Sequence, residues 1–299
     1  MNKENKFTSD EIKINIDNNI KKNSKIISKK EYEEILEKFK KYGVLNFSNF
    51  SLNTENLTKF IDLFSESYSH DARRRTIRFD NKNIRSVDAG YNKITLHSET
   101  SFSPSRPEII WLHCTSPPKT NSGKTILCDG LRLWDSLSAD VKNFFLGDPI
   151  CYSLKIPIDE KIKGKGKKRW YLNNLGVRNC YLNFNDKSIE FEYIVFAVKK
   201  SPYINKLCFA NHVLPPIKDE SQILSRKMYN GKKIPKKIID EIRKKAASLT
   251  KAVHWKKNDL FMIDNTRYMH GREAIDPKED ARDIITMQTA KSKFSFGSD

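Results

Sequence analysis

Residues 259–275 read DLFMIDNTRYMHGREAI, and this stretch decides the fold class. The run Asp259–Asp264 is short and apolar, which predicts a buried strand. His270 follows it near a strand end or turn. After a polar turn, Arg282–Ala290 (RDIITMQTA) has the pattern of another strand, and a hairpin would bring Arg282 back beside the His270 strand. The C-terminal part of the chain is therefore expected to be antiparallel β structure.

The same strand pattern recurs earlier in the chain, mixed with helices. Apolar and β-branched runs predict strands at Val44–Phe47, Glu108–Thr115, Gly123–Asp129 and Ser188–Lys199. Helical spacing of apolar residues predicts helices at Glu31–Tyr42 (ending at Gly43), from Asn53 or Thr54 through Phe64, at Leu131–Phe145 and at Pro235–Leu249. We expect a mainly β protein, a sandwich or barrel decorated with helices, with its site at strand ends in the mouth of the barrel.

Polarity along the chain suggests how it is organised. Residues 1–28 are rich in Lys and Asn and lack an apolar run, so we expect a flexible polar tail and no signal peptide. Residues 29–299 are expected to form a single domain, with a mixed insertion at about residues 150–250. Inside the insertion, Lys161–Arg169 (KIKGKGKKR) is expected to be a mobile loop, of a kind that can cover a substrate.

Composition limits the classes of partner. The 55 Lys and Arg residues against 37 Asp and Glu give a net charge of +18, which would suit nucleic acid, an anionic membrane or an acidic protein. Because the lysine run at 161–169 has no stacking aromatics among its residues, we favour a Lys- and Asn-rich composition over nucleic-acid binding. The five cysteines form no CxxC pair, which is typical of reduced thiols in the cytoplasm. No apolar stretch approaches the ~18 residues of a membrane span.

Three separated residues form a candidate metal site. His97 and Glu99 lie two apart, and in an extended strand both side chains point the same way. Alone this pair means little, because six histidines and many acids supply about one such pair by chance. His270 would complete a set of two imidazoles and one carboxylate, which leaves three positions open on Fe(II). Arg282 could hold a carboxylate of a dicarboxylate cosubstrate bidentately, and Thr125 offers a hydroxyl to the same group.

These segments resemble the taurine dioxygenase superfamily of Fe(II)/2-oxoglutarate oxygenases. The resemblance is greatest to its clavaminate synthase-like and syringomycin-hydroxylase-like branch, in which Glu is the carboxylate ligand. It rests on residues 96–118 (LHSETSFSPSRPEIIWLHCTSPP), 122–130 (SGKTILCDG), 209–212 (FANH) and 259–288, and it spans the chain from about Glu31 onward. The resemblance implies a distorted double-stranded β-helix, or jelly roll.

By the same resemblance, His97, Glu99 and His270 are the iron ligands, and Thr125 and Arg282 anchor 2-oxoglutarate. The implied enzyme is a 2-oxoglutarate-dependent dioxygenase with Fe(II), 2-oxoglutarate and O2 as cofactors. It would hydroxylate an unactivated C–H bond of an amino acid or amino-acid derivative, free or carried on an acidic carrier protein. Succinate and CO2 would be the coproducts, and a biosynthetic role follows from the branch.

Several positions depart from the family pattern or carry weaker expectations. Relatives often have Gly-Gly where Ser122-Gly123 stands, and taurine-type enzymes have an arginine at the position of Thr286, so a small sulfonate or similar anion is a less expected substrate. The carboxylate of Glu99 disfavours halogenation. Further candidates for contact with the substrate are Arg272, His212 and Arg106.

Two alternatives of other kinds stay open. One is an oxygenase of the same type that acts on nucleic acid or another polymer. The other is a non-catalytic binding protein on the same fold. The sequence does not determine the substrate, the oxidised carbon or the oligomeric state.

Overall fold

The computed structural model describes residues 13–15, 27–48, 54–69, 75–87, 90–157, 179–184, 188–216, 223–276, 278 and 282–295. The expected mobile loop at 161–169 lies outside these residues, as does most of the expected N-terminal tail. Three residues of that tail form β1 (Lys13–Asn15), which pairs in parallel with β2 (Val44–Ser48). The expectation of one domain with an insertion stays a prediction.

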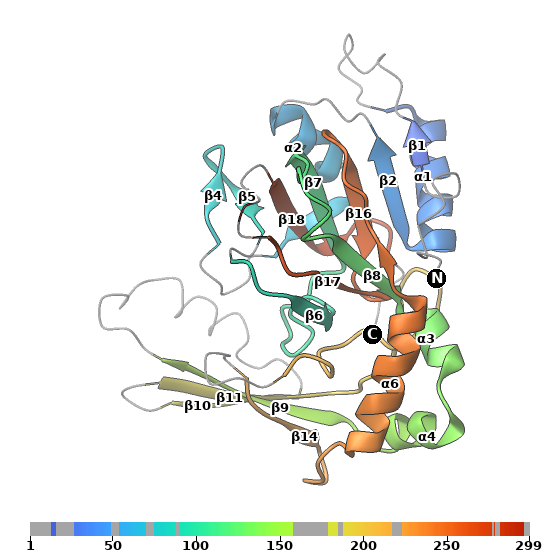
Figure 1. Ribbon diagram of the computed structural model, residues 1–299, viewed down its shortest axis with the longest axis vertical. Coiled ribbons are helices and arrows are strands. Elements are labelled where there is room, and N and C mark those ends of the chain that lie inside the picture. Colours follow the sequence, from blue (N-terminus) through green and yellow to red (C-terminus); the bar gives the residue numbers. More distant parts are fainter. Residues whose placement is uncertain are drawn as a thin grey trace.

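An eight-stranded sheet forms the larger layer of the molecule (Figure 1). Its strands lie in the order β1-β2-β16-β7-β18-β5-β4, and β3 also pairs with β18. Except for the β1–β2 pair, its pairings are antiparallel. The further strands of this sheet are β3 (Ser65–Tyr68), β4 (Ile77–Arg78), β5 (Asn81–Ser86), β7 (Ile109–Ser116), β16 (Leu260–Asp264) and β18 (Asp283–Ser292).

A four-stranded antiparallel sheet faces the larger one, in the order β15-β8-β17-β6. Side chains of both sheets share one buried cluster, which includes Leu112 and Phe261 from the larger sheet and Leu127 and Tyr268 from the smaller. The two sheets therefore form a sandwich, and the expectation of a mainly β jelly roll is confirmed. The strands of the smaller sheet are β6 (Ile94–His97), β8 (Thr125–Asp129), β15 (Lys251–Ala252) and β17 (Tyr268–Arg272).

Two N-terminal helices cover the outer face of the larger sheet. Helix α1 (Lys29–Tyr42) begins with a capping box between Ser28 and Glu31 and ends at Gly43, whose φ of +72° is the left-handed conformation that glycine adopts easily. Buried side chains of α1 and α2 (Thr54–Asp62) pack on strands β2, β7, β16 and β18 in a second cluster. The expected helices and the expected cap are both present.

Strands and helices from residues 130–249 form a further layer at the lower end of the molecule in Figure 1. A four-stranded sheet in the order β10-β11-β9-β14 packs with α3, α4 and α6 in a third cluster, which Cys128 and Met269 join from the smaller sheet. Bounds of these elements are α3 (Gly130–Ser136), α4 (Ala139–Gly147), β9 (Ile150–Pro157), β10 (Cys180–Phe184), β11 (Ser188–Val195), β14 (Ile223–Met228) and α6 (Lys236–Leu249); β12 (Lys199–Lys200) and β13 (Leu207–Cys208) form a short ribbon.

One expected helix is divided in two. The spacing of apolar residues predicts a single helix over Leu131–Phe145, whereas the chain breaks at Leu137 and Ser138. Leu137 is extended, and the Ser138 hydroxyl accepts a hydrogen bond from the Val141 amide as the cap of α4. Serine competes for backbone hydrogen bonds and therefore favours a helix start over a helix interior. Among the described residues, no helix is long and apolar enough to cross a membrane.

Candidate metal centre

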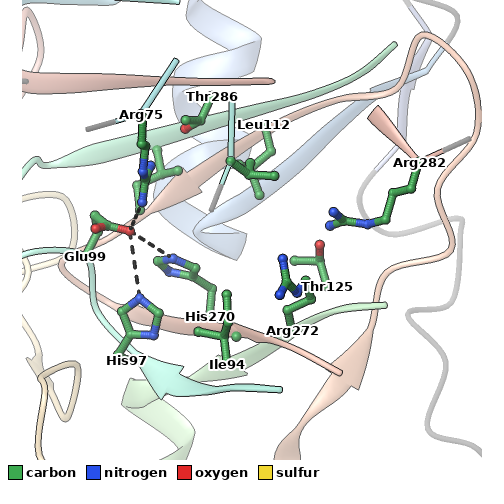
Figure 2. Close-up of a pocket in the computed structure, with 13 residues that line it drawn as sticks. Arg75, Ile94, His97, Glu99, Leu112, Thr125, His270, Arg272, Arg282 and Thr286 are labelled. Atoms are coloured by element: carbon green, nitrogen blue, oxygen red, sulfur yellow. Dashed lines mark hydrogen bonds and ion pairs between the residues drawn. The ribbon is translucent and has the colours of Figure 1, made fainter. Parts of the chain in front are cut away.

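Strand pairing brings together the three candidate ligands. His97 ends β6, and His270 lies in the middle of β17, directly opposite it in the antiparallel register. Their ring centroids are 4.5 Å apart. Glu99 follows two residues after His97, in the turn beyond β6, and points back toward both rings (Figure 2).

The positions of the ligand atoms fit a metal ion. One atom of each residue lies within 4.8 Å of the others, and Glu99 Oε2 is 3.8 Å from His97 Nε2 and 3.4 Å from His270 Nε2. Three ligand atoms at about 2.1 Å from one ion, at right angles, would lie about 3 Å from each other. His97 and Glu99 are 5% and 3% exposed, so these two candidate ligands are shielded from bulk water by the protein.

A backbone contact orients the His97 ring. Its Nδ1 lies 2.8 Å from the carbonyl oxygen of Thr95, which requires the ring proton to be on Nδ1. The lone pair is then on Nε2, which is buried and has no hydrogen-bond partner among the described residues. Such a carbonyl contact on the distal nitrogen is the usual way in which proteins fix a metal-binding imidazole.

Charge in the cluster favours metal binding. Burial raises the pKa of Glu99, but the positive charge of Arg75 and the closeness of the His270 and His97 rings outweigh it and hold that pKa well below its usual range. Burial, followed by the neighbouring His97, lowers the pKa of His270. The carboxylate is therefore ionised and the His270 imidazole neutral near pH 7, which are the forms that coordinate a cation.

The cation beside the carboxylate, Arg75, was not expected. Its Nη2 lies 3.3 Å from Glu99 Oε2, and both side chains are buried. Nothing in the sequence distinguishes Arg75 from Arg73 and Arg74, because the contact joins residues that lie in different parts of the sandwich.

Asn265 holds the turn that carries Glu99. Its Oδ1 accepts the Glu99 amide at 2.8 Å, and its Nδ2 donates to the carbonyl oxygens of Glu99 at 3.1 Å and of Pro107 at 2.8 Å. Asn265 is fully buried and follows directly after β16. The two halves of the metal centre are thus tied together by one amide side chain.

A cavity between the two sheets opens beside the metal cluster. It has an empty volume of about 490 Å3, including its open mouth. Thr125, Arg272 and Arg282 lie on the side away from Glu99 and His97 (Figure 2). Apolar side chains line the wall between the two ends: Val87, Ile94, Ile110 and Leu112.

The polar end of the cavity is also built from facing strands. Thr125 begins β8, and its register partner on β17 is Arg272. Arg282 stands directly before β18. The Thr125 hydroxyl accepts a hydrogen bond of 3.1 Å from the Trp255 indole, which leaves its proton available to a ligand.

A comparison with protein-family models identifies the family of this chain. Residues 11–288 match the model of "Taurine catabolism dioxygenase TauD, TfdA family". The chain belongs to this TauD/TfdA family. The expected dioxygenase class is thereby confirmed. No curated protein matches the sequence significantly.

Solved structures show how widely the TauD/TfdA fold is shared. AAD-2, solved with Mn(II) and N-oxalylglycine, is 17% identical, with 89% of each chain covered and a TM-score of 0.56. PvcB from Pseudomonas aeruginosa, an Fe, alpha-ketoglutarate dependent oxygenase from an isonitrile synthetic pathway, is 13% identical in one structure, covering 86% of this chain and 78% of its own, with a TM-score of 0.55. At such low sequence identities the structural similarity shows a shared fold and nothing further. The expected cofactors, Fe(II) and 2-oxoglutarate (alpha-ketoglutarate), are those on which PvcB depends.

The three weaker candidates occupy different places in this TauD/TfdA chain. Arg272 lines the cavity, and its Nη2 donates to the carbonyl oxygens of Gly90 and Asn92. His212 packs edge-on against His97, 5.3 Å between ring centroids, but does not line the cavity. Arg106 does not line it either; its Nη2 donates to the Asn265 carbonyl at 2.6 Å. Of the three, the structure brings only Arg272 to the cavity.

Proposed function

We propose that this protein is an Fe(II)/2-oxoglutarate-dependent oxygenase that hydroxylates an unactivated C–H bond of an amino acid or an amino-acid derivative. The observation that supports this best is the placement of two polar ends in one cavity. His97, Glu99 and His270 lie at one end, and Thr125 and Arg282 lie at the other. A dicarboxylate that chelates a metal at the first end can extend its far carboxylate to the second.

Each residue has a defined task in the proposal. His97, Glu99 and His270 hold the metal, and Thr125 and Arg282 hold the far carboxylate of 2-oxoglutarate. When bound, iron supplies the activation of O2 that is coupled to decarboxylation of 2-oxoglutarate to succinate and CO2. The apolar wall of the cavity excludes water from the reacting groups.

The substrate class rests on the likeness of residues 96–118 and 259–288 to the clavaminate synthase-like branch. The net charge of +18 would also suit an acidic carrier protein as the bearer of the substrate. For the place of action we propose the cytoplasm, because the five cysteines are free. Four of them are buried, and burial raises the pKa of Cys114, Cys128 and Cys208 to about 12, so they act as core residues.

Release of succinate tests the proposal. Purified protein is incubated with Fe(II), 2-oxoglutarate and O2, with each of the common amino acids and with carrier-bound amino acids. We expect succinate from the wild type. In His97→Ala the rate of succinate release should fall by at least about a hundredfold, because one of the three metal ligands is missing. The matched control is His254→Ala, which removes an exposed histidine that does not line the cavity.

Two results would contradict the proposal. One is a wild type that releases no succinate with any of these substrates and also fails to bind Co(II) with 2-oxoglutarate. The other is a His97→Ala protein as active as the His254→Ala control.

A further inference from the structure

A second, smaller hollow adjoins the metal cavity. It has an empty volume of about 200 Å3 and shares Arg75 and Thr286 with the larger cavity. We call it the arginine subsite. Its lining residues are Ser69, Arg75, Asn83, Arg85, Thr286 and Gln288.

Two buried polar atoms in the arginine subsite lack hydrogen-bond partners in the described part of the chain. Thr286 and Gln288 are 3% and 5% exposed, and neither Thr286 Oγ1 nor Gln288 Oε1 has a hydrogen-bond partner among the described residues. They lie two apart on β18, so both point to the same face of the sheet. Burying a polar group without a hydrogen-bond partner is costly, so a pair of them in a hollow indicates a ligand that supplies the missing partners.

The register of the sheet adds a cation to these two groups. Arg85 on β5 is the Cα partner of Thr286 on β18, so the side chains of the two residues stand on the same face. The Arg85 guanidinium donates to two backbone carbonyls, those of Lys82 at 3.3 Å and Arg75 at 3.4 Å. These are long contacts to neutral oxygens, so the positive charge of Arg85 is not neutralised by them.

Charge in the subsite is therefore positive. It is lined by two arginines, and no carboxylate is among its lining residues in the described part of the chain. The second arginine, Arg75, reaches Glu99 on the other side and so connects the subsite to the metal centre. An anion held here would lie beside the reacting position.

We propose that the arginine subsite binds the free carboxylate of the substrate through Arg85 and Arg75, while Gln288 Oε1 accepts a hydrogen bond from the substrate's amino group. This inference rests on the proposed function and narrows its substrate class. The substrate is an amino acid or derivative with a free α-carboxylate and an N–H donor, not one tethered to a carrier through that carboxyl group. Thr286 carries no positive charge, and Arg85 on the neighbouring strand β5 supplies that charge instead.

Fluorine NMR can test the subsite without turnover. The protein is loaded with Co(II) and saturating 2-oxoglutarate, which occupies the Arg282 end, and the probe is trifluoroacetate, with trifluoroacetamide as its neutral counterpart. We expect the Co(II) ion to broaden the trifluoroacetate signal but not the trifluoroacetamide signal. Protein loaded with diamagnetic Zn(II) shows how much broadening is not paramagnetic.

Substitutions assign the binding to these residues. Arg85→Gln should raise the trifluoroacetate Kd by about tenfold or more, the usual loss for one hydrogen bond to a charged group. Arg85→Lys retains the charge and should lose less. Lys82→Gln, three residues away on the same strand and exposed, is the control for a change in net charge and should leave the Kd unchanged.

Competition tests the amino contact. Glycine should displace trifluoroacetate at a lower concentration than acetate does, and Gln288→Leu should remove this advantage. Equal displacement by glycine and acetate in the wild type would refute the role of Gln288.

The remaining outcomes separate the two proposals. Equal broadening of both probes, or none of either, in a protein that binds Co(II) and 2-oxoglutarate would overturn the arginine subsite, as would an Arg85→Gln protein with the wild-type Kd. Failure to bind Co(II) and 2-oxoglutarate at all would instead contradict the proposed function.

Discussion

At the scale of single residues, the metal centre depends on neighbours that are not ligands. The Thr95 carbonyl selects the His97 tautomer, Arg75 keeps Glu99 ionised, and Asn265 fixes the backbone of Glu99. Each neighbour sets the charge or direction of a ligand before any metal arrives. Pre-organisation of this kind reduces what binding must supply.

The lowered pKa of His270 gives the metal-free protein a defined dependence on pH. Its pKa in the folded state lies below the ordinary imidazole value, so between the two the unfolded chain binds more protons. Stability is therefore lost as the pH falls from about 6.5 through the folded pKa. Denaturant unfolding at several pH values should show that the free energy of unfolding of His270→Asn falls less than that of the wild type on acidification. A larger fall in the variant than in the wild type would contradict this.

Arg267 is a structural residue whose removal should be costly. It donates to both carboxylate oxygens of Asp129, at 3.0 and 2.6 Å, and both side chains are buried. Arg267→Met leaves a buried carboxylate without its cation, and we expect a loss of about 3–5 kcal/mol in the free energy of unfolding. Lys59→Met breaks the exposed pair with Glu55 and should destabilise the protein far less, because water and salt screen an exposed pair. Equal losses in urea unfolding would show that the buried pair has no special role.

At the scale of elements, strand register places the functional side chains. Along β17, Tyr268, His270 and Arg272 alternate with Met269 and Gly271. The first set faces the other sheet and the cavity, while Met269 packs against α3, α4 and α6 in the third cluster. A shift by one residue would remove His270 and Arg272 from the cavity together.

Close approach of β17 and β6 makes Gly271 irreplaceable. A Cβ at this position would lie 2.6 Å from the Ile94 carbonyl oxygen and 3.2 Å from the Leu96 amide, so Gly271→Ala must push β6 away. Since His97 ends β6, we expect Co(II) affinity to fall by about tenfold or more. Gly147→Ala, where a Cβ meets no atom within 4 Å, is the control in the same titration. Unchanged Co(II) affinity in Gly271→Ala would mean that the strands yield without moving the ligand.

Periodicity alone was sufficient for much of this arrangement. The run 259–264 predicts β16, and the apolar spacing of α1 with Gly43 predicts both the helix and its end. The spacing of apolar residues predicts one helix over Leu131–Phe145. That prediction is wrong because Ser138 caps a new helix in the middle of this range.

Contacts between distant residues were beyond the reach of local patterns. The hydrogen bond from the Glu99 amide to Asn265 joins positions 166 apart in the chain, and the facing of Arg85 and Thr286 depends on how β5 pairs with β18. Local spacing could suggest which side chains carry chemistry. It could not show which of them share a cavity, because that depends on the packing of the two sheets.

At the scale of the whole molecule, the cavity lies between the two sheets, so its ligands should stabilise the entire sandwich. His97, His270 and Thr125 come from the smaller sheet, whereas Leu112 and Thr286 come from the larger. We expect Co(II) with 2-oxoglutarate, each at a hundred times its Kd, to raise the free energy of unfolding by about 2.7 kcal/mol per bound ligand. Calorimetric or denaturant unfolding measures this directly.

Two variants divide that stabilisation between its sources. His270→Asn should abolish the effect of Co(II), whereas Arg282→Gln should retain the effect of Co(II) and lose most of that of 2-oxoglutarate. If Arg282→Gln responds to 2-oxoglutarate as the wild type does, the far carboxylate lies elsewhere.

The order of strands in the larger sheet carries a consequence for how such an enzyme diverges. Strands β5 and β4 end the sheet, beyond β18, whereas the metal ligands come from β6, β17 and the turn after β6. In our proposal the residue that selects the substrate, Arg85, therefore sits on a ribbon at the border of the sheet, apart from the strands that carry the metal ligands. Gene duplication followed by change in this ribbon alone could then produce descendants with new preferences that retain the ancestral oxidising apparatus intact.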